Sequence, residues 1–177
     1  LGLRLMGIDG VVLDVPDSAA NDAAFGRPSA GPRGDGAFPQ VKKLSLVELG
    51  THVEVAFIVK HGHGGERAMV EGLLRHLTPE MLLLLDQGFY SYEQWRKLTA
   101  TGVKLLARVV KSMILRPIRT LSDGSYLAKV YKNDYDRQKD RDGIVVRVIR
   151  YTLDDPQRVG HGEEHVLLTN LFDEDLY

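Results

Sequence analysis

Two apolar runs that each end in an aspartate constrain the fold of this chain most. Asp9 closes the run LRLMGID, and Asp86 follows the run MLLLL. Apolar runs of this kind are typical of buried strands, and an isolated charge is too costly to bury beside them. In open α/β sheets, ligands bind outside the carboxyl ends of the strands. The pattern therefore predicts an α/β fold in which both acids face a cleft or a metal ion.

Each aspartate also has an ordinary structural explanation. An Asp after a strand can be a turn residue or a helix cap, and Asp9-Gly10 is a strong signal for a hairpin between strands at residues 3–8 and 11–15. For Asp9 alone, this turn explanation is slightly favoured. Asp86 differs because Ser91 and the residues after it fit a Ser-x-x-Gln capping box for the next helix, which leaves Asp86 free for another role.

The composition predicts one substantial core with an appended subdomain. Of the 177 residues, 44% are hydrophobic and 27% are charged, and there is no cysteine, which excludes disulfides and cysteine-ligated zinc. No apolar stretch reaches the roughly 18 residues of a membrane helix, and no signal-like leader opens the chain. We expect a cytoplasmic protein without membrane contact. The start at Leu1 rather than Met predicts a fragment.

A basic segment lies in the middle of the chain although the formal net charge is only −1. No acidic residue occurs between Glu93 and Asp123. Neutralising phosphates releases counterions, so such a segment can bind a nucleic-acid backbone; solvated surface charge is the commoner cause of such a run. The candidate DNA contacts within it are Arg108, Lys111 and Arg116.

The order of strand and helix signals predicts a mixed sheet. A second antiparallel pair is expected at residues 41–49 and 53–60, around Gly50. Helices are expected at 66–77 and 92–101, and strands before Asp86 and at 103–110. Strands that alternate with helices in this way pair in parallel through right-handed crossovers. The residues 26–39 are rich in Gly and Pro and predict an irregular loop.

Beyond residue 112 the pattern becomes one of short strands. They are expected at residues 114–120, 125–131, 144–153 and 165–171, with a hairpin turn at Asp123-Gly124. No helix is predicted in this part, and the charged residues 132–142 are expected to form an exposed loop. A further pattern, the pair His61 and His63, can bind metal, but without a third ligand it is better explained as a surface loop.

Three segments resemble the DDE transposases of bacterial insertion sequences, in the group with a Tyr, Arg and Glu signature. They are GIDGVVLDVPDSAANDAAFG, MLLLLDQGFYSYEQW, and LLARVVKS together with LSDGSYLAKVY. The resemblance implies a ribonuclease H-like mixed sheet with flanking helices and a β-rich insertion. It also implies cleavage and joining of double-stranded DNA at transposon ends and at the target. We expect the first part of the catalytic core at residues 1–111 and the insertion at 112–177.

Within this resemblance, Asp9 matches the first acid of the family and Asp86 the second. The third is a Glu in a Tyr-x-x-Arg-x-x-x-Glu pattern on a helix after the insertion, and no such pattern is found here. The acids at 173–175 lie too early for it. We therefore expect a C-terminally truncated catalytic domain that lacks the closing helix of the core, does not cleave DNA by itself, and belongs to a protein that can form a homodimer at full length.

The chemistry of phosphodiester cleavage agrees with these assignments. Two divalent ions can stabilise charge on the attacking and leaving oxygens, and carboxylates suit Mg2+ or Mn2+. We expect Asp9 and Asp86 to be catalytic metal ligands and Mg2+ or Mn2+ to be the cofactor. Two other hypotheses remain open: a non-catalytic DNA-binding relic, and a metal-dependent nuclease of the same fold.

Overall fold

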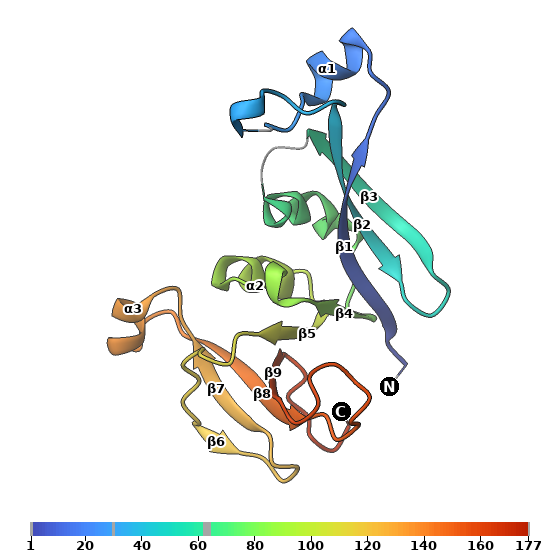
Figure 1. The fold of residues 1–177 in the computed structure, drawn as a ribbon. Coiled ribbons are helices and arrows are strands. Elements are labelled where there is room, and N and C mark those ends of the chain that lie inside the picture. Colours follow the sequence, from blue (N-terminus) through green and yellow to red (C-terminus); the bar gives the residue numbers. More distant parts are fainter. Residues whose placement is uncertain (1, 30, 62–64, 177) are drawn as a thin grey trace. The chain divides into compact units, whose positions relative to one another are not determined.

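The computed structural model describes residues 2–29, 31–61 and 65–176 and divides the chain into two compact units (Figure 1). One unit is Met6–His76. The other combines Leu1–Leu5 with Leu77–Tyr177. Each unit is described by itself below.

The Met6–His76 unit is a three-stranded antiparallel sheet with helical segments. Its strands are β1 (Arg4–Asp14, which begins in the other unit), β2 (Gln40–Glu48) and β3 (Val53–His61), with β2 in the centre. The helical segments are α1 (Ala19–Phe25), η1 (Gly31–Arg33) and η2 (Glu66–His76). The second predicted strand pair and the helix after it are thus confirmed, although η2 is wound as a 3₁₀-helix.

The predicted hairpin at Asp9-Gly10 is wrong, because β1 runs straight through both residues. Each residue from Met6 to Asp14 has a partner in β2, and Gly10 lies opposite Leu44. A turn at Gly10 would remove this ladder, so long-range pairing outweighs the local turn preference. Gly10 instead leaves space for the carboxyl group of Glu66, the first residue of η2, since a Cβ at this position would lie 2.6 Å from the carboxyl carbon.

The sheet of the second unit combines parallel and antiparallel pairs. The strands β4 (Met81–Leu85) and β5 (Lys104–Val109) are parallel, as the strand–helix–strand pattern predicts. Antiparallel pairing then continues in the order β5, β9 (Glu164–Thr169), β8 (Ile144–Thr152), β7 (Tyr126–Val130) and β6 (Arg119–Thr120). The chain therefore has a mixed α/β architecture.

The crossover between β4 and β5 contains η3 (Gln87–Phe89) and α2 (Tyr92–Thr99). Ser91 caps α2, since its Oγ accepts a hydrogen bond from the backbone N–H of Gln94 at 3.2 Å. Gly102 follows the helix with a positive φ of 84°, which Gly adopts without steric cost. Trp95 and Leu98 are buried on the inner face of α2. The predicted cap, helix and stop are all confirmed.

The part after residue 112 is less regular than the sequence predicts. The predicted strand at 114–120 shrinks to the two residues of β6, and the charged residues 132–142 are not a plain loop because they contain α3 (Asp134–Gln138). Asn133 caps α3 by accepting from the backbone N–H of Asp136 at 2.9 Å. The turn at Asp123-Gly124 is confirmed, with a hydrogen bond from Leu121 N–H to the Ser125 carbonyl at 2.8 Å.

A buried guanidinium on β8 connects three segments of this unit. Arg147 is 2% exposed. Its Nε donates to Ser125 Oγ at 2.9 Å, its Nη1 to the carbonyl of Leu171 at 3.2 Å, and its Nη2 to Asp123 Oδ2. Burying a charge is tolerable only when it is paired and hydrogen-bonded. Arg147 therefore fixes the β6–β7 turn and the segment after β9 against the sheet.

Replacing Arg147 tests this connection. The variant Arg147→Met should lose about 3 kcal/mol of unfolding free energy, because it leaves the Ser125 hydroxyl and the Leu171 carbonyl without their donor. Urea denaturation followed by circular dichroism measures the loss. Arg150→Met is the matched control, since Arg150 lies on the same strand but is exposed, and a change there should stay within about 1 kcal/mol. Equal losses in both variants would contradict the role of Arg147.

The same network predicts acid sensitivity. Hydrogen bonds from Ser125, together with Arg147, lower the pKa of Asp123 from 3.8 to about 2. A lowered pKa in the folded state stabilises the protein above the ordinary pKa, and this stability is lost as pH falls from about 4 toward 2. The melting temperature of Asp123→Asn should therefore fall less over this pH range than that of the wild type. Asp154→Asn, at an exposed position, should follow the wild type, and an unchanged slope in Asp123→Asn would refute the prediction.

Candidate functional site

The parallel strands β4 and β5 end at one edge of the sheet, and this edge carries two of the predicted site residues. The register pairs Leu85 with Ala107, so Asp86 and Arg108 are the next residue on each strand. Both are exposed. Asp86 keeps an extended backbone (φ −73°, ψ 162°) and its side chain does not cap η3. The carboxylate is therefore displayed at the strand end, as the sequence predicts, beside a strand that presents a cation.

The residues after Asp86 anchor it from the core side. Phe89 is buried, and the ring of Tyr90 lies 6.1 Å from that of Trp95, centroid to centroid. Burial raises the pKa of Tyr90, so its hydroxyl stays protonated. The buried rings of Phe89 and Trp95 and the Ser91 cap hold the chain where η3 ends and α2 begins. An acid on such a supported turn is well suited to bind a ligand in a fixed geometry.

Asp9 lies in the other unit, and its position differs from the prediction. It is in the middle of β1 and not at a strand end, exposed and opposite Ser45. Its Oδ1 accepts the N–H of Gly10 at 2.9 Å. The neighbouring acids are engaged elsewhere: Asp14 accepts from Gln40 at 2.9 Å, and Asp17 pairs with Arg27. Of these three acids, Asp9 is therefore the one that hydrogen-bonds to the residue next to it in the chain.

The predicted site residues provide only some of the ligands that a hard divalent cation needs. Asp9 and Asp86 each offer an exposed carboxylate, which is a preferred ligand of Mg2+. Within the described ranges, however, no group of three or more acidic or histidine side chains could hold a metal ion. His61 is exposed at the end of β3, and His63 lies outside the described residues.

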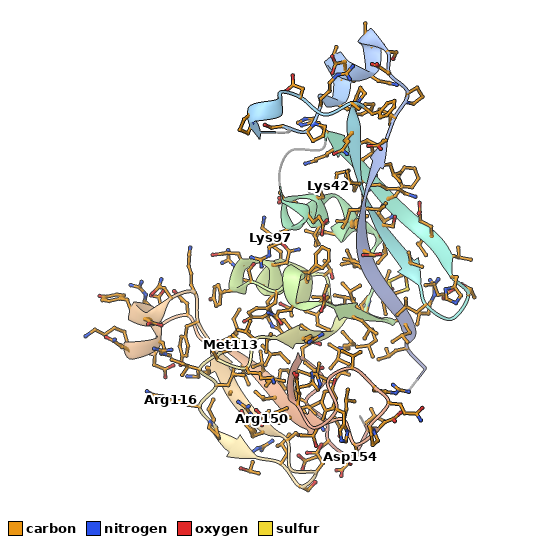
Figure 2. The ribbon with its side chains drawn as sticks, viewed as in Figure 1. Lys42, Lys97, Met113, Arg116, Arg150 and Asp154 are labelled. Carbon is orange, nitrogen blue, oxygen red and sulfur yellow. The ribbon has the colours of Figure 1, made fainter. Side chains whose placement is uncertain are left out.

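The three predicted DNA contacts are all exposed but differ in their surroundings. Lys111 forms an ion pair with Glu163 at 3.3 Å, and both side chains are more than half exposed. An exposed ion pair of this kind contributes little to stability, so Lys111 can exchange Glu163 for a phosphate. Arg108 lies on β5, whereas Arg116 lies on the segment that leads into β6 (Figure 2).

Sequence reasoning missed a second group of cationic residues near Arg116. Lys129 and Arg137 line the same hollow as Arg116. Arg137 belongs to α3, in a stretch that the sequence predicts to be an exposed loop. Asn133, whose side chain caps α3, is the sequence signal that could have revealed this helix.

Comparison with known proteins identifies the family to which this chain belongs. The sequence matches the family described as "Transposase DDE domain" over residues 3–173. The chain therefore belongs to the transposase DDE domain family, and the resemblance read from the sequence is confirmed.

Two particular proteins are similar to the chain, one in sequence and one in fold. The chain is 31% identical over 141 residues to the transposase InsG for insertion sequence element IS4 of Escherichia coli (strain K12), which covers 78% of this chain and 31% of that protein. Its fold is similar to that of the piggyBac transposase in a synaptic complex with hairpin DNA, with a TM-score of 0.52 and 13% identity over 97% of this chain and 34% of the other. The chain thus spans about a third of each of these proteins. None of the described helices is long and apolar enough to cross a membrane.

Metal binding at the two acids can be measured in solution. We expect weak Mn2+ binding, because separate carboxylates hold a hard cation loosely. Paramagnetic broadening of amide signals around Gln87 should disappear in Asp86→Asn, and broadening around Gly10 should disappear in Asp9→Asn. The control Asp154→Asn should leave both effects in place. Broadening that persists in both acid variants would move the metal site elsewhere.

Proposed function

We propose that this chain is the part of an insertion-sequence DDE transposase that carries the first two catalytic acids. The full reaction would be metal-dependent cleavage and strand transfer at the transposon ends. The observation that carries the proposal is the exposed Asp86 at the carboxyl end of a parallel strand, in a chain that belongs to the transposase DDE domain family.

The strand arrangement supports a ribonuclease H-like core. Three antiparallel strands are followed along the chain by two parallel strands joined through a helical crossover. We infer that residues 1–111 form the first part of this core and that 112–177 form its β-rich insertion. In support of this boundary, every described strand after residue 112 pairs antiparallel with its neighbours.

Each site residue has a defined role in this proposal. Asp9 and Asp86 would hold Mg2+ or Mn2+, and the bound metal would stabilise charge on the attacking and leaving oxygens. Arg108 lies at the same strand end as Asp86 and can attract a phosphate of the DNA by its fixed positive charge. Lys111 and Arg116 would extend this contact along the strand of double-stranded DNA, at the transposon end or at the target. A homodimer at full length would bring two transposon ends together.

A non-catalytic DNA-binding relic is the second candidate. One observation favours it: among the described residues there is no cluster of three metal-binding side chains. A relic would keep the basic surface and lose turnover. The two candidate functions differ in whether Asp86 is needed for DNA cleavage.

The deciding experiment supplies the third acid. The chain is fused to the C-terminal segment of the IS4 transposase that follows the region of similarity, and nicking of supercoiled plasmid that carries IS4 ends is measured in Mn2+. The 177-residue chain alone should be inactive, whereas the fusion should nick the plasmid. Asp86→Asn in the fusion should reduce nicking by about a hundred-fold or more, because it removes a metal ligand from the transition state.

The control is thermal stability, which Asp86→Asn should leave unchanged because the side chain is exposed. A fusion that nicks equally well with Asn at position 86 would exclude the proposed site. A folded fusion that does not nick at all, with both acids intact, would favour the DNA-binding relic.

A further inference from the structure

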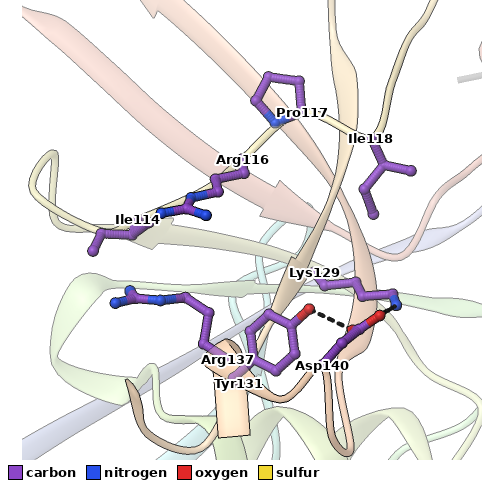
Figure 3. Close-up of a pocket in the computed structure, with 8 residues that line it drawn as sticks. All are labelled: Ile114, Arg116, Pro117, Ile118, Lys129, Tyr131, Arg137 and Asp140. Atoms are coloured by element: carbon purple, nitrogen blue, oxygen red, sulfur yellow. Dashed lines mark hydrogen bonds and ion pairs between the residues drawn. The ribbon is translucent and has the colours of Figure 1, made fainter. Parts of the chain in front are cut away.

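A trough crosses the surface of the second unit beside α3. Its first part is a cavity of about 340 Å³, and one wall is the apolar segment of Ile114, Pro117 and Ile118 (Figure 3). A second hollow of about 310 Å³ shares Ile114, Tyr131 and Arg137 with the first and continues toward the cap of α3. Ile114 is 49% exposed and Ile118 is 58% exposed. Large apolar side chains gathered in this way around a hollow are typical of a binding surface.

The opposite side of the trough is polar, and its charged side chains are already paired with each other. Lys129 Nζ donates to both carboxylate oxygens of Asp140, at 2.7 and 2.8 Å. The Tyr131 hydroxyl donates to Asp140 at 2.7 Å, and this hydrogen bond raises the pKa of Tyr131. The charge of Asp140 is therefore satisfied within the protein, so that it repels an incoming anion less.

Two arginines supply positive charge that is less fully compensated. Arg116 is exposed and, among the residues that the structure describes, forms no ion pair. Arg137 pairs at 3.1 Å with Asp134, whose side chain is 79% exposed. Both line the trough, and Figure 3 shows their guanidinium groups on the same side as Ile114. An anion placed there would meet two planar donors and an apolar wall together.

We propose that this trough binds an unpaired DNA strand. Its phosphate would lie between Arg116 and Arg137, and its sugar and base would lie against the wall formed by Ile114, Pro117 and Ile118. An unpaired strand offers both an anion and apolar surface, whereas a duplex shows mainly phosphates and hides its base faces. The apolar wall therefore selects the unpaired strand. The inference rests on the proposed function, because that function makes DNA the partner.

The test measures DNA binding without metal. Fluorescence anisotropy compares a short labelled oligothymidylate with the duplex that it forms with its complement, in the presence of a chelator. Arg116→Ala should weaken single-strand binding by about ten-fold, because a guanidinium–phosphate contact is a strong charge-assisted hydrogen bond. Ile118→Ser should weaken single-strand binding by about five-fold and change duplex binding by less than about two-fold, because only unpaired bases reach an apolar wall.

The control variant is Arg119→Ala, which removes the same charge from an exposed position that does not line the trough. It should leave single-strand binding within about two-fold of the wild type, since it tests only the general loss of charge. Equal losses in Arg116→Ala and Arg119→Ala, or equal effects of Ile118→Ser on single strand and duplex, would overturn the inference. Displacement of the strand by an acidic peptide at lower concentration than by unlabelled DNA would also overturn it, in favour of a protein partner.

The inference about the trough and the proposed function can be refuted independently of each other. Asp86→Asn should leave single-strand binding unchanged, because Asp86 does not line the trough. If nicking by the fusion depends on Asp86 while the trough variants bind like the wild type, the function stands and the trough has no part in it.

Discussion

Parallel pairing of β4 and β5 is the constraint on which the candidate site depends. Two parallel strands present the same end to the same edge, so the residues that follow them share that edge without any contact between their side chains. Asp86 and Arg108 come together in this way although they are 22 positions apart in the sequence. The crossover between the strands is short and carries a buried tryptophan. Packing of α2 on the sheet therefore also helps to fix the position of Asp86 at the end of β4.

The two units display their acids by different means. On β4, the acid follows the strand and precedes a turn whose Phe89 ring is buried. On β1, Asp9 lies within the ladder, and pairing on either side of it fixes the backbone. In the proposed function both acids would share one role, which neither environment shows alone. The structure thus explains how each acid is presented.

The sequence predicted the elements in which local and long-range preferences agree. The parallel pair, the Ser91 cap and the Asp123-Gly124 turn each have a strong local signal that tertiary packing reinforces. At Asp9-Gly10 the two preferences conflict, and nine paired residues outweigh one turn. The helices α1 and α3 were missed because each is short, and α1 buries no residue, so neither shows an apolar face. Asp86 and Arg108 could be found from the sequence, but the trough depends on α3 and could not.

The buried Arg147 also bears on how the antiparallel part of the sheet finds its correct alignment. Side chains alternate between the faces of a strand, so a slip of one residue in β8 would turn Arg147 to the opposite face and separate it from Asp123 and Ser125. The valines on both sides of it would tolerate such a slip, since one apolar side chain can replace another. A charge that has partners on one face only makes the shifted pairing costly. Arg147 therefore favours the observed register of β8 over a register shifted by one residue.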